Sequence, residues 1–130
     1  MITAIQKLML TWAVHAFGDV AYDPKERALR VLEEAAELAQ EAGVELDQAK
    51  ILLVRTFSRP IAKPEQEAAG VLVTLLSYCA SRDIDLSAAF VAEVLRVTDP
   101  DKLAELRNKH FDNIRAGTST QKETPEEIII

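Results

Sequence analysis

Apolar side chains recur at helical spacing along most of the chain. Ile5, Leu8 and Phe17, for example, lie near one stripe of a helix. The alternation of apolar and polar residues that is typical of strands is nearly absent. The pattern predicts six helices, over residues 3–17, 24–42, 46–57, 64–81, 85–97 and 99–115. We therefore expect an all-α fold, a bundle of about five to six helices joined by short connections.

Local signals support several of the predicted helix ends. Asp23 and Pro24 form a plausible N-cap and first helical residue, and Gly43 is a natural C-terminal stop. The segment after residue 115 is polar until the three isoleucines that end the chain. We expect one helical domain over residues 1–115 and a flexible tail over residues 116–130, although the isoleucines could dock on a neighbouring subunit.

The fourth predicted helix contains the most apolar stretch of the chain. From Ala68 to Ala80 it is apolar nearly all round, which predicts a place in the centre of the bundle or in a subunit interface. One small bundle does not easily cover such a helix, so we expect a homo-oligomer. No run reaches the roughly 18 apolar residues of a membrane span, and we expect no membrane partner.

Size and charge narrow the classes of function. The chain has 130 residues, enough for one domain, and a formal net charge of −6, which disfavours binding to a nucleic acid backbone. A metal ion between the protein and its ligand would still permit binding of a polyphosphate. The lone Cys79 rules out an internal disulfide and is expected to be buried. We expect a cytoplasmic protein, because the N-terminal stretch lacks the cleavage pattern of a signal peptide.

The second predicted helix carries closely spaced carboxylates. Glu34 and Glu37 are three residues apart, which places their Cβ atoms about 5–6 Å from each other on one side of a helix. Two carboxylates at that distance repel each other unless a cation lies between them. The simpler alternative is a solvated face eased by arginines, formed by Glu26, Glu33, Glu34, Glu37 and Glu41 with Arg27 and Arg30.

Glu67 favours the interpretation as a cation site. It begins a helix that is otherwise almost wholly apolar, and a charge that enters a core needs a cation or a polar cavity. Gly70, Thr74, Ser77 and Ser81 continue the same stripe, as a surface for tight helix packing or as the wall of a polar pocket. A glycine within a helix costs roughly 1 kcal/mol relative to Ala, which suggests a close approach to the backbone at Gly70.

The residue types indicate which metal such a site would take. The two histidines, His15 and His110, are not preceded by a glutamate three residues earlier, which disfavours a di-iron site. Cysteine and histidine spacing for zinc is also lacking. Carboxylate oxygens alone suit Mg²⁺, or Mn²⁺ in its place.

In these motifs the chain resembles the MazG-like proteins of the all-α NTP pyrophosphatase superfamily, in which E-E-x-x-E is followed one helix pair later by E-x-x-D. The resemblance spans Trp12 to Arg115 and is strongest to a small branch often found in phages and prophages. The matching stretches are Trp12 with Phe17-Gly18, Arg30-x-Leu32-Glu33-Glu34-Ala35-x-Glu37-Leu38, Ser58-Arg59-Pro60, Gln66-Glu67-x-x-Gly70-Val71 and Ile84-Asp85-Leu86.

The resemblance implies hydrolysis of a nucleoside triphosphate to a monophosphate and pyrophosphate by a homodimer or homotetramer. Mg²⁺ would be held by Glu34, Glu37 and Glu67, and Glu33 would orient or deprotonate the attacking water. Clearance of non-canonical nucleotides is the corresponding cellular role. The candidates for contact with the base or the phosphates are Trp12, Arg30, Lys102, Arg107, Lys109 and Arg115.

One position departs from the family pattern. Gly70 stands where the family has the Asp of E-x-x-D, so one expected metal ligand is missing, and Glu93 on the next helix is a candidate replacement. Two alternatives follow from this departure. The protein could bind nucleotides without hydrolysing them, or it could be a structural helical oligomer with Val71 to Tyr78 as its interface.

Overall fold

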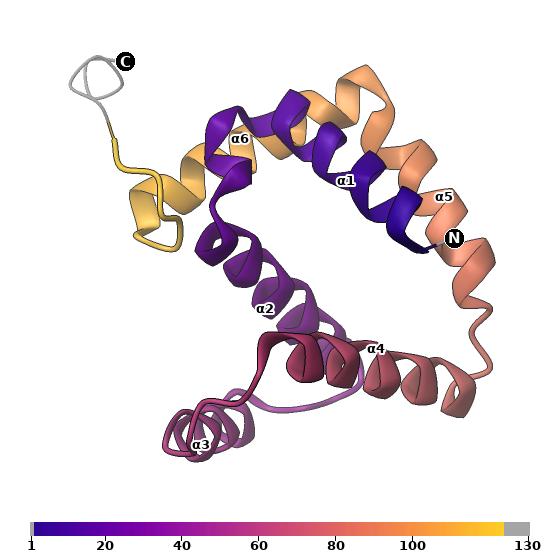
Figure 1. Ribbon diagram of the computed structural model, residues 1–130, viewed down its shortest axis with the longest axis vertical. Coiled ribbons are helices and arrows are strands. Elements are labelled where there is room, and N and C mark those ends of the chain that lie inside the picture. The colour runs from indigo at the N-terminus through magenta and orange to yellow at the C-terminus, as the bar shows by residue number, and fades with distance from the viewer. Residues whose placement is uncertain (1, 124–130) are drawn as a thin grey trace. The chain divides into compact units, whose positions relative to one another are not determined.

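A computed structural model describes residues 2–123, and these residues form helices and connections without a strand (Figure 1). The prediction of an all-α fold is confirmed. The three final isoleucines, Ile128, Ile129 and Ile130, lie outside the described residues. The helices are α1 (Ile2–Phe17), the 3₁₀-helix η1 (Asp19–Tyr22), α2 (Pro24–Glu41), α3 (Leu46–Phe57), α4 (Pro64–Ser81), α5 (Leu86–Thr98) and α6 (Pro100–Ala116).

Two of these helices begin at an Asp-Pro pair, and the aspartate satisfies backbone donors of the first turn in both. The Asp23 carboxylate accepts the backbone N–H of Lys25 at 2.9 Å at the start of α2. At the start of α6, the Asp99 carboxylate accepts the N–H of Asp101 at 2.9 Å. The proline that follows each aspartate lacks an N–H that would be unpaired at this position.

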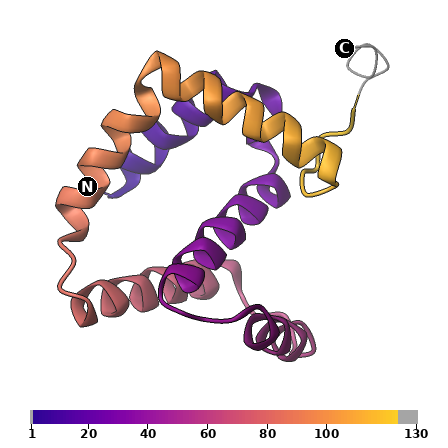
Figure 2. The same ribbon diagram turned by 180° about the vertical axis from the view of Figure 1, so that it is seen from behind.

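The chain divides into two compact units. One comprises Met1–Glu41 and Val97–Ile130, of which residues 2–41 and 97–123 are described, and we call it the terminal unit. The other, Ala42–Arg96, contains α3, α4 and most of α5, and we call it the central unit. Figure 2 shows the same helices from behind.

The core of the terminal unit lies between α1 and α6, which run side by side in both ribbon views (Figures 1 and 2). Ala13 and Ala16 of α1 are buried, and their small side chains let α6 approach closely. Leu103 and Ile114 contribute the larger buried side chains from α6. The Arg107 guanidinium closes the end of α1, donating to the carbonyl of Ala16 at 2.9 Å and to that of His15 at 3.1 Å.

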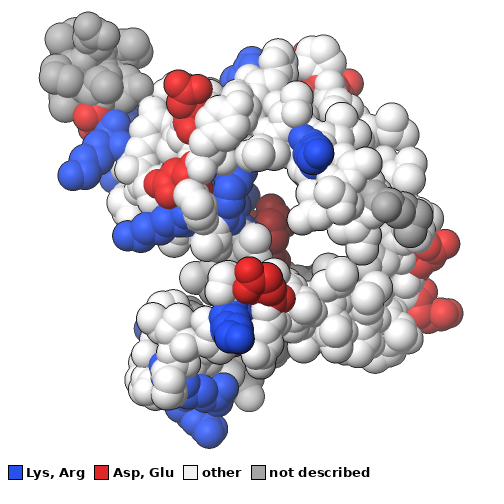
Figure 3. Space-filling model, viewed as in Figure 1, with Lys and Arg blue, Asp and Glu red and all other residues white. Residues whose placement is uncertain are grey.

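In the central unit most of the large apolar side chains are exposed. Phe57 on α3 is 79% exposed and Val73 on α4 is 65% exposed, whereas Cys79 is buried. Beyond Glu67, α4 carries no charged side chain and contributes uncharged surface in Figure 3. The central unit by itself therefore leaves the apolar α4 without full cover. Within residues 2–123, no helix has the length and apolar character needed to cross a membrane.

Gly117 ends α6 in the left-handed conformation, with φ at 77°. A Cβ added there would meet no atom within 4 Å, so the backbone conformation alone opposes a side chain. We predict that Gly117→Ala lowers the free energy of unfolding by about 1 kcal/mol. Gly117→Asn should lower it less, because asparagine tolerates this conformation. Urea unfolding followed by circular dichroism measures both; an alanine variant as stable as the asparagine variant would contradict the prediction.

Candidate functional site

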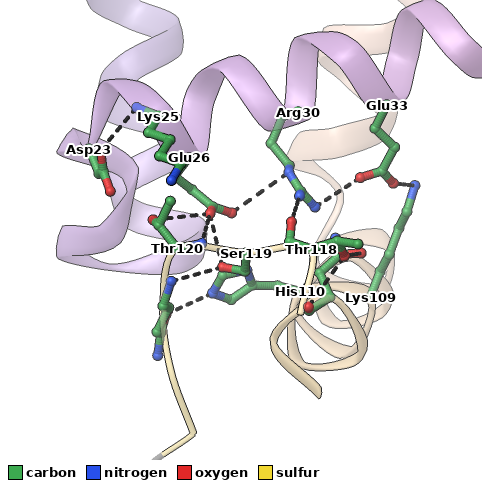
Figure 4. A network of polar contacts seen from close by, with 12 residues as sticks. Asp23, Lys25, Glu26, Arg30, Glu33, Lys109, His110, Thr118, Ser119 and Thr120 are labelled. Atoms are coloured by element: carbon green, nitrogen blue, oxygen red, sulfur yellow. Dashed lines mark hydrogen bonds and ion pairs between the residues drawn. The ribbon is translucent and has the colours of Figure 1, made fainter. Parts of the chain in front are cut away.

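A row of charged side chains follows one stripe of α2. Glu26, Arg30, Glu33 and Glu37 are four, three and four residues apart, so they succeed one another along the helix surface. Two other parts of the terminal unit meet this row, namely Lys109 of α6 and the segment 118–121 that follows α6 (Figure 4). The candidate site is this network.

Glu26 anchors the row and is fully buried. Its Oε2 atom accepts three hydrogen bonds from the segment after α6: the Ser119 hydroxyl at 2.9 Å, the Thr120 N–H at 2.7 Å and the Thr120 hydroxyl at 3.2 Å (Figure 4). The Arg30 Nε lies 3.7 Å from the other carboxylate oxygen. These contacts offset the desolvation of the charge, which would otherwise be costly.

The contacts also decide the protonation of Glu26. Burial raises the pKa of its carboxyl, but the bonds from Thr120 and Ser119 and the charge of Arg30 outweigh burial and hold the pKa below its ordinary value. Glu26 therefore does not belong to a solvated face of α2, the alternative that the helical spacing offered for this residue. The residues that donate hydrogen bonds to Glu26 lie more than 90 positions further along the chain, so the helical spacing of α2 alone contains no sign of the burial.

Each of the three guanidinium nitrogens of Arg30 faces an oxygen of the terminal unit, and Nη2 donates a hydrogen bond. Its Nη2 donates to the carbonyl oxygen of Thr118, its Nη1 lies 2.8 Å from the Glu33 carboxylate, and its Nε faces Glu26. The guanidinium thus joins the segment after α6 to the acidic row of α2.

Lys109 reaches two carboxylates at once. Its Nζ is 2.8 Å from Glu33 Oε1 and 3.1 Å from Glu37 Oε1. The bond to Glu33 raises the pKa of Lys109, burial opposes this effect, and Glu37 adds to the rise. Glu33 is therefore held by a cation at each oxygen, Arg30 on one side and Lys109 on the other. Two glutamates of the E-E-x-x-E motif converge on a single positive charge.

The other predicted substrate-binding residues of the terminal unit have separate partners. The Trp12 indole N–H donates to the carbonyl of Val97 at 3.2 Å. The Trp12 ring packs edge-on against the Phe17 ring, with the two ring centroids 5.7 Å apart. Lys102 pairs with Glu105 at 3.2 Å, and Arg107 is bonded to α1. Arg115 lies 3.8 Å from Asp112. The structure brings together Arg30, Glu33, Glu37 and Lys109, but not these residues.

The predicted metal ligands are divided between the two units. Glu34 and Glu37 belong to α2, whereas Glu67 and Glu93 belong to the central unit. Glu67 is exposed in the first turn of α4. Glu93 pairs with Arg96 at 2.6 Å, and this bond lowers the pKa of Glu93. In the described part of either unit, three or more His, Cys, Asp or Glu side chains do not gather to hold a metal ion, and the full ligand set stays a prediction.

The small polar stripe of α4 is satisfied within its own helix. The Thr74 hydroxyl donates to the carbonyl of Gly70 at 2.9 Å, the Ser77 hydroxyl to that of Thr74 at 2.9 Å, and the Ser81 hydroxyl to that of Tyr78 at 2.7 Å. A Cβ added at Gly70 would meet no neighbouring atom within 4 Å. The close approach suggested by the sequence is therefore not present at Gly70.

Comparison of the chain with models of known protein families, with curated proteins and with solved structures found no match. The resemblance to the MazG-like proteins consequently rests on the motifs of the sequence.

Removal of the Glu26 carboxylate should destabilise the terminal unit strongly. We predict that Glu26→Ala lowers the free energy of unfolding by about 3 kcal/mol, because Arg30 and the donors of residues 119 and 120 lose a buried partner. Glu26→Gln keeps an acceptor oxygen and should cost less. Urea unfolding at neutral pH compares the two variants with the wild type.

The pH dependence of the same variants checks the charge. Since the folded pKa of Glu26 is depressed, its stabilising contribution is complete above the unfolded pKa and disappears as the pH falls through the folded value. The difference in stability between the wild type and Glu26→Gln should therefore shrink as the pH is lowered into the acidic range. A difference that stays constant with pH would contradict the assignment of a buried charge.

Proposed function

We propose that this protein is a Mg²⁺-dependent nucleoside triphosphate pyrophosphohydrolase of the MazG-like type, which converts an NTP or dNTP to the monophosphate and pyrophosphate. The observation that carries the proposal is the convergence of Glu33 and Glu37 on one cation, the Lys109 ammonium. Glu33 and Glu37 belong to the E-E-x-x-E motif of the family. Their two negative charges lie close enough together to need a positive charge between them, which Lys109 supplies. Clearance of non-canonical nucleotides in the cytoplasm is the role that the family resemblance suggests.

The donor set fits a hard divalent cation. Mg²⁺ is commonly held by one or two carboxylates together with waters and substrate phosphates, so it does not require a closed cage of protein ligands. Glu34 and Glu37 of α2 and Glu67 of α4 would hold it, with Glu93 as a further candidate. When bound, the metal would neutralise phosphate charge and lower the pKa of a coordinated water.

The remaining groups of the network have roles that follow from their chemistry. Glu33 is an acceptor suited to orienting or deprotonating a water, once one of its oxygens is released by Arg30 or Lys109. Arg30 and Lys109 would bind phosphate oxygens of the substrate. Together these exchanges would replace internal ion pairs with contacts to metal and substrate. Trp12, Lys102 and Arg107 stay weaker candidates, because each is bonded elsewhere.

A second candidate function is nucleotide binding without hydrolysis. Gly70 favours it, because it removes the carboxylate that the family places at this position of α4. Such a protein would be stabilised against heat by nucleotide with Mg²⁺ but would release no pyrophosphate.

The exposed apolar surface of α4 supports a homo-oligomer. Val71, Val73 and Leu76 are each about half exposed or more, at 49%, 65% and 50%. Burial of these side chains against a second copy would stabilise both chains by the hydrophobic effect. We propose a homodimer or homotetramer in which α4 forms the interface.

Glu37→Gln tests the metal assignment. The variant keeps the size and hydrogen-bonding capacity of the side chain but removes the charge that Mg²⁺ requires, so Mg²⁺-dependent pyrophosphate release should fall at least about a hundredfold. Asp112→Asn is the matched control, because it makes the same chemical change on an exposed face of α6. An unchanged circular dichroism spectrum checks folding. Wild-type turnover in Glu37→Gln would refute the assignment.

Val73→Lys tests the oligomer. A lysine at the centre of the apolar face of α4 should dissociate the assembly toward the mass of one chain, 14.4 kDa, in light scattering coupled to size-exclusion chromatography. Ala104→Lys, at an exposed position of α6, is the control and should keep the wild-type mass. A monomeric mass for the wild-type chain itself would overturn the proposal.

A further inference from the structure

The four residues after α6 form a strap over the start of α2. Every one of them, Thr118 to Gln121, has a partner in the terminal unit. The Thr118 N–H donates to the carbonyl of Asn113 at 2.9 Å, and Gln121 Oε1 lies 2.9 Å from Nε2 of His110, which is itself buried. Residues 119 and 120 supply the donors to Glu26 (Figure 4). The strap is therefore fixed at both ends and in its middle.

The strap also engages one of the cations of the candidate site. The Thr118 carbonyl accepts from Arg30 Nη2, while Glu26 and Glu33 face the other two guanidinium nitrogens. The bidentate contact of an arginine with a phosphate uses Nη2 together with Nη1 or Nε, and Nη2 is the nitrogen that the Thr118 carbonyl occupies. Bidentate binding of a phosphate by Arg30 therefore requires the Thr118 contact to break.

We propose that the strap, Thr118 to Gln121, is an autoinhibitory latch that closes over Arg30 and competes with a phosphate group for its guanidinium. The inference rests on the proposed function, since it takes the ligand to be a polyphosphate. A phosphate is a stronger partner for a guanidinium than a backbone carbonyl, because both groups are charged and two parallel bonds can form. Glu26 holds the strap closed, because three groups of the strap donate hydrogen bonds to one of its carboxylate oxygens.

The latch lowers the apparent affinity for the ligand in proportion to the fraction of molecules that are closed. A protein whose binding-competent state is rarely populated binds with a dissociation constant raised by that fraction. A substitution that weakens the bonds between the strap and Glu26, and leaves Arg30 unchanged, should therefore tighten ligand binding. This result would be opposite to the one expected if the strap merely supported the site.

The test uses full-length Thr120→Pro, which removes both the N–H and the hydroxyl that Thr120 donates to Glu26. Opening of the strap is followed by hydrogen exchange of the Gln121 amide, which is bonded to the Ser119 hydroxyl at 3.1 Å in the closed form. Binding is measured by calorimetry with inorganic pyrophosphate and Mg²⁺. We expect faster exchange and a dissociation constant about tenfold lower than that of the wild type.

Two further variants locate the effect. Ser119→Thr keeps the hydroxyl donor and should behave as the wild type. Arg30→Lys, combined with Thr120→Pro, should abolish the gain in affinity, because a lysine cannot make the bidentate contact. If Thr120→Pro does not fold, Ser119→Ala with Thr120→Val removes the two hydroxyl donors while keeping the backbone N–H, and should give a smaller gain in the same direction.

Equal or weaker pyrophosphate binding with a faster-exchanging strap would overturn the latch. An unchanged exchange rate of the Gln121 amide would also overturn the latch, because the bonds from Thr120 to Glu26 would then not hold the strap closed. A lack of pyrophosphate binding in every variant would overturn it as well. Binding is measured without turnover, so the two proposals can fail separately. A gain in affinity, with no triphosphate hydrolysed by any variant, would leave the latch in place and refute the enzyme.

Discussion

The terminal unit depends on one buried charge, the carboxylate of Glu26. A charge without solvent is tolerated only where hydrogen bonds and an opposite charge replace the water. Here Ser119 and Thr120 donate the hydrogen bonds, and Arg30 of the same helix supplies the opposite charge. The requirement explains why residues 118–121 lie on α2 rather than extending from α6. The same requirement positions the Arg30 side chain, which pairs with Glu26. Arg30 in turn pairs with Glu33, the next carboxylate of the row.

The acidic row of α2 is thereby held in a neutralised state. Glu33 has a cation at each carboxylate oxygen, and Glu37 shares Lys109 with it. The same groups that balance the charge of this face are those that a metal and a polyphosphate would engage, so binding and internal ion pairing compete for the same atoms. A site of this kind can be stable without ligand and still change its partners when a ligand arrives.

The sequence predicted the helices well, because periodic apolar residues, Asp-Pro pairs and Gly43 are local signals. It also predicted that Glu34 and Glu37 belong to one helix, since spacing alone decides this. It did not predict the contact of Lys109 with Glu33 and Glu37, which joins residues more than 70 positions apart and depends on how α6 packs. Residues 118–121 read as an ordinary polar tail, because a hydroxyl that bonds a buried glutamate looks no different in sequence from one in water.

The central claim is that the chain hydrolyses a nucleoside triphosphate with the help of a divalent metal. Its most direct test is pyrophosphate release by the wild-type protein from a panel of canonical and modified nucleoside triphosphates, with Mg²⁺, with Mn²⁺ and with EDTA. The account predicts release from at least one substrate with metal and none with EDTA. No pyrophosphate release from any substrate of the panel, or release that persists in EDTA, would contradict the account.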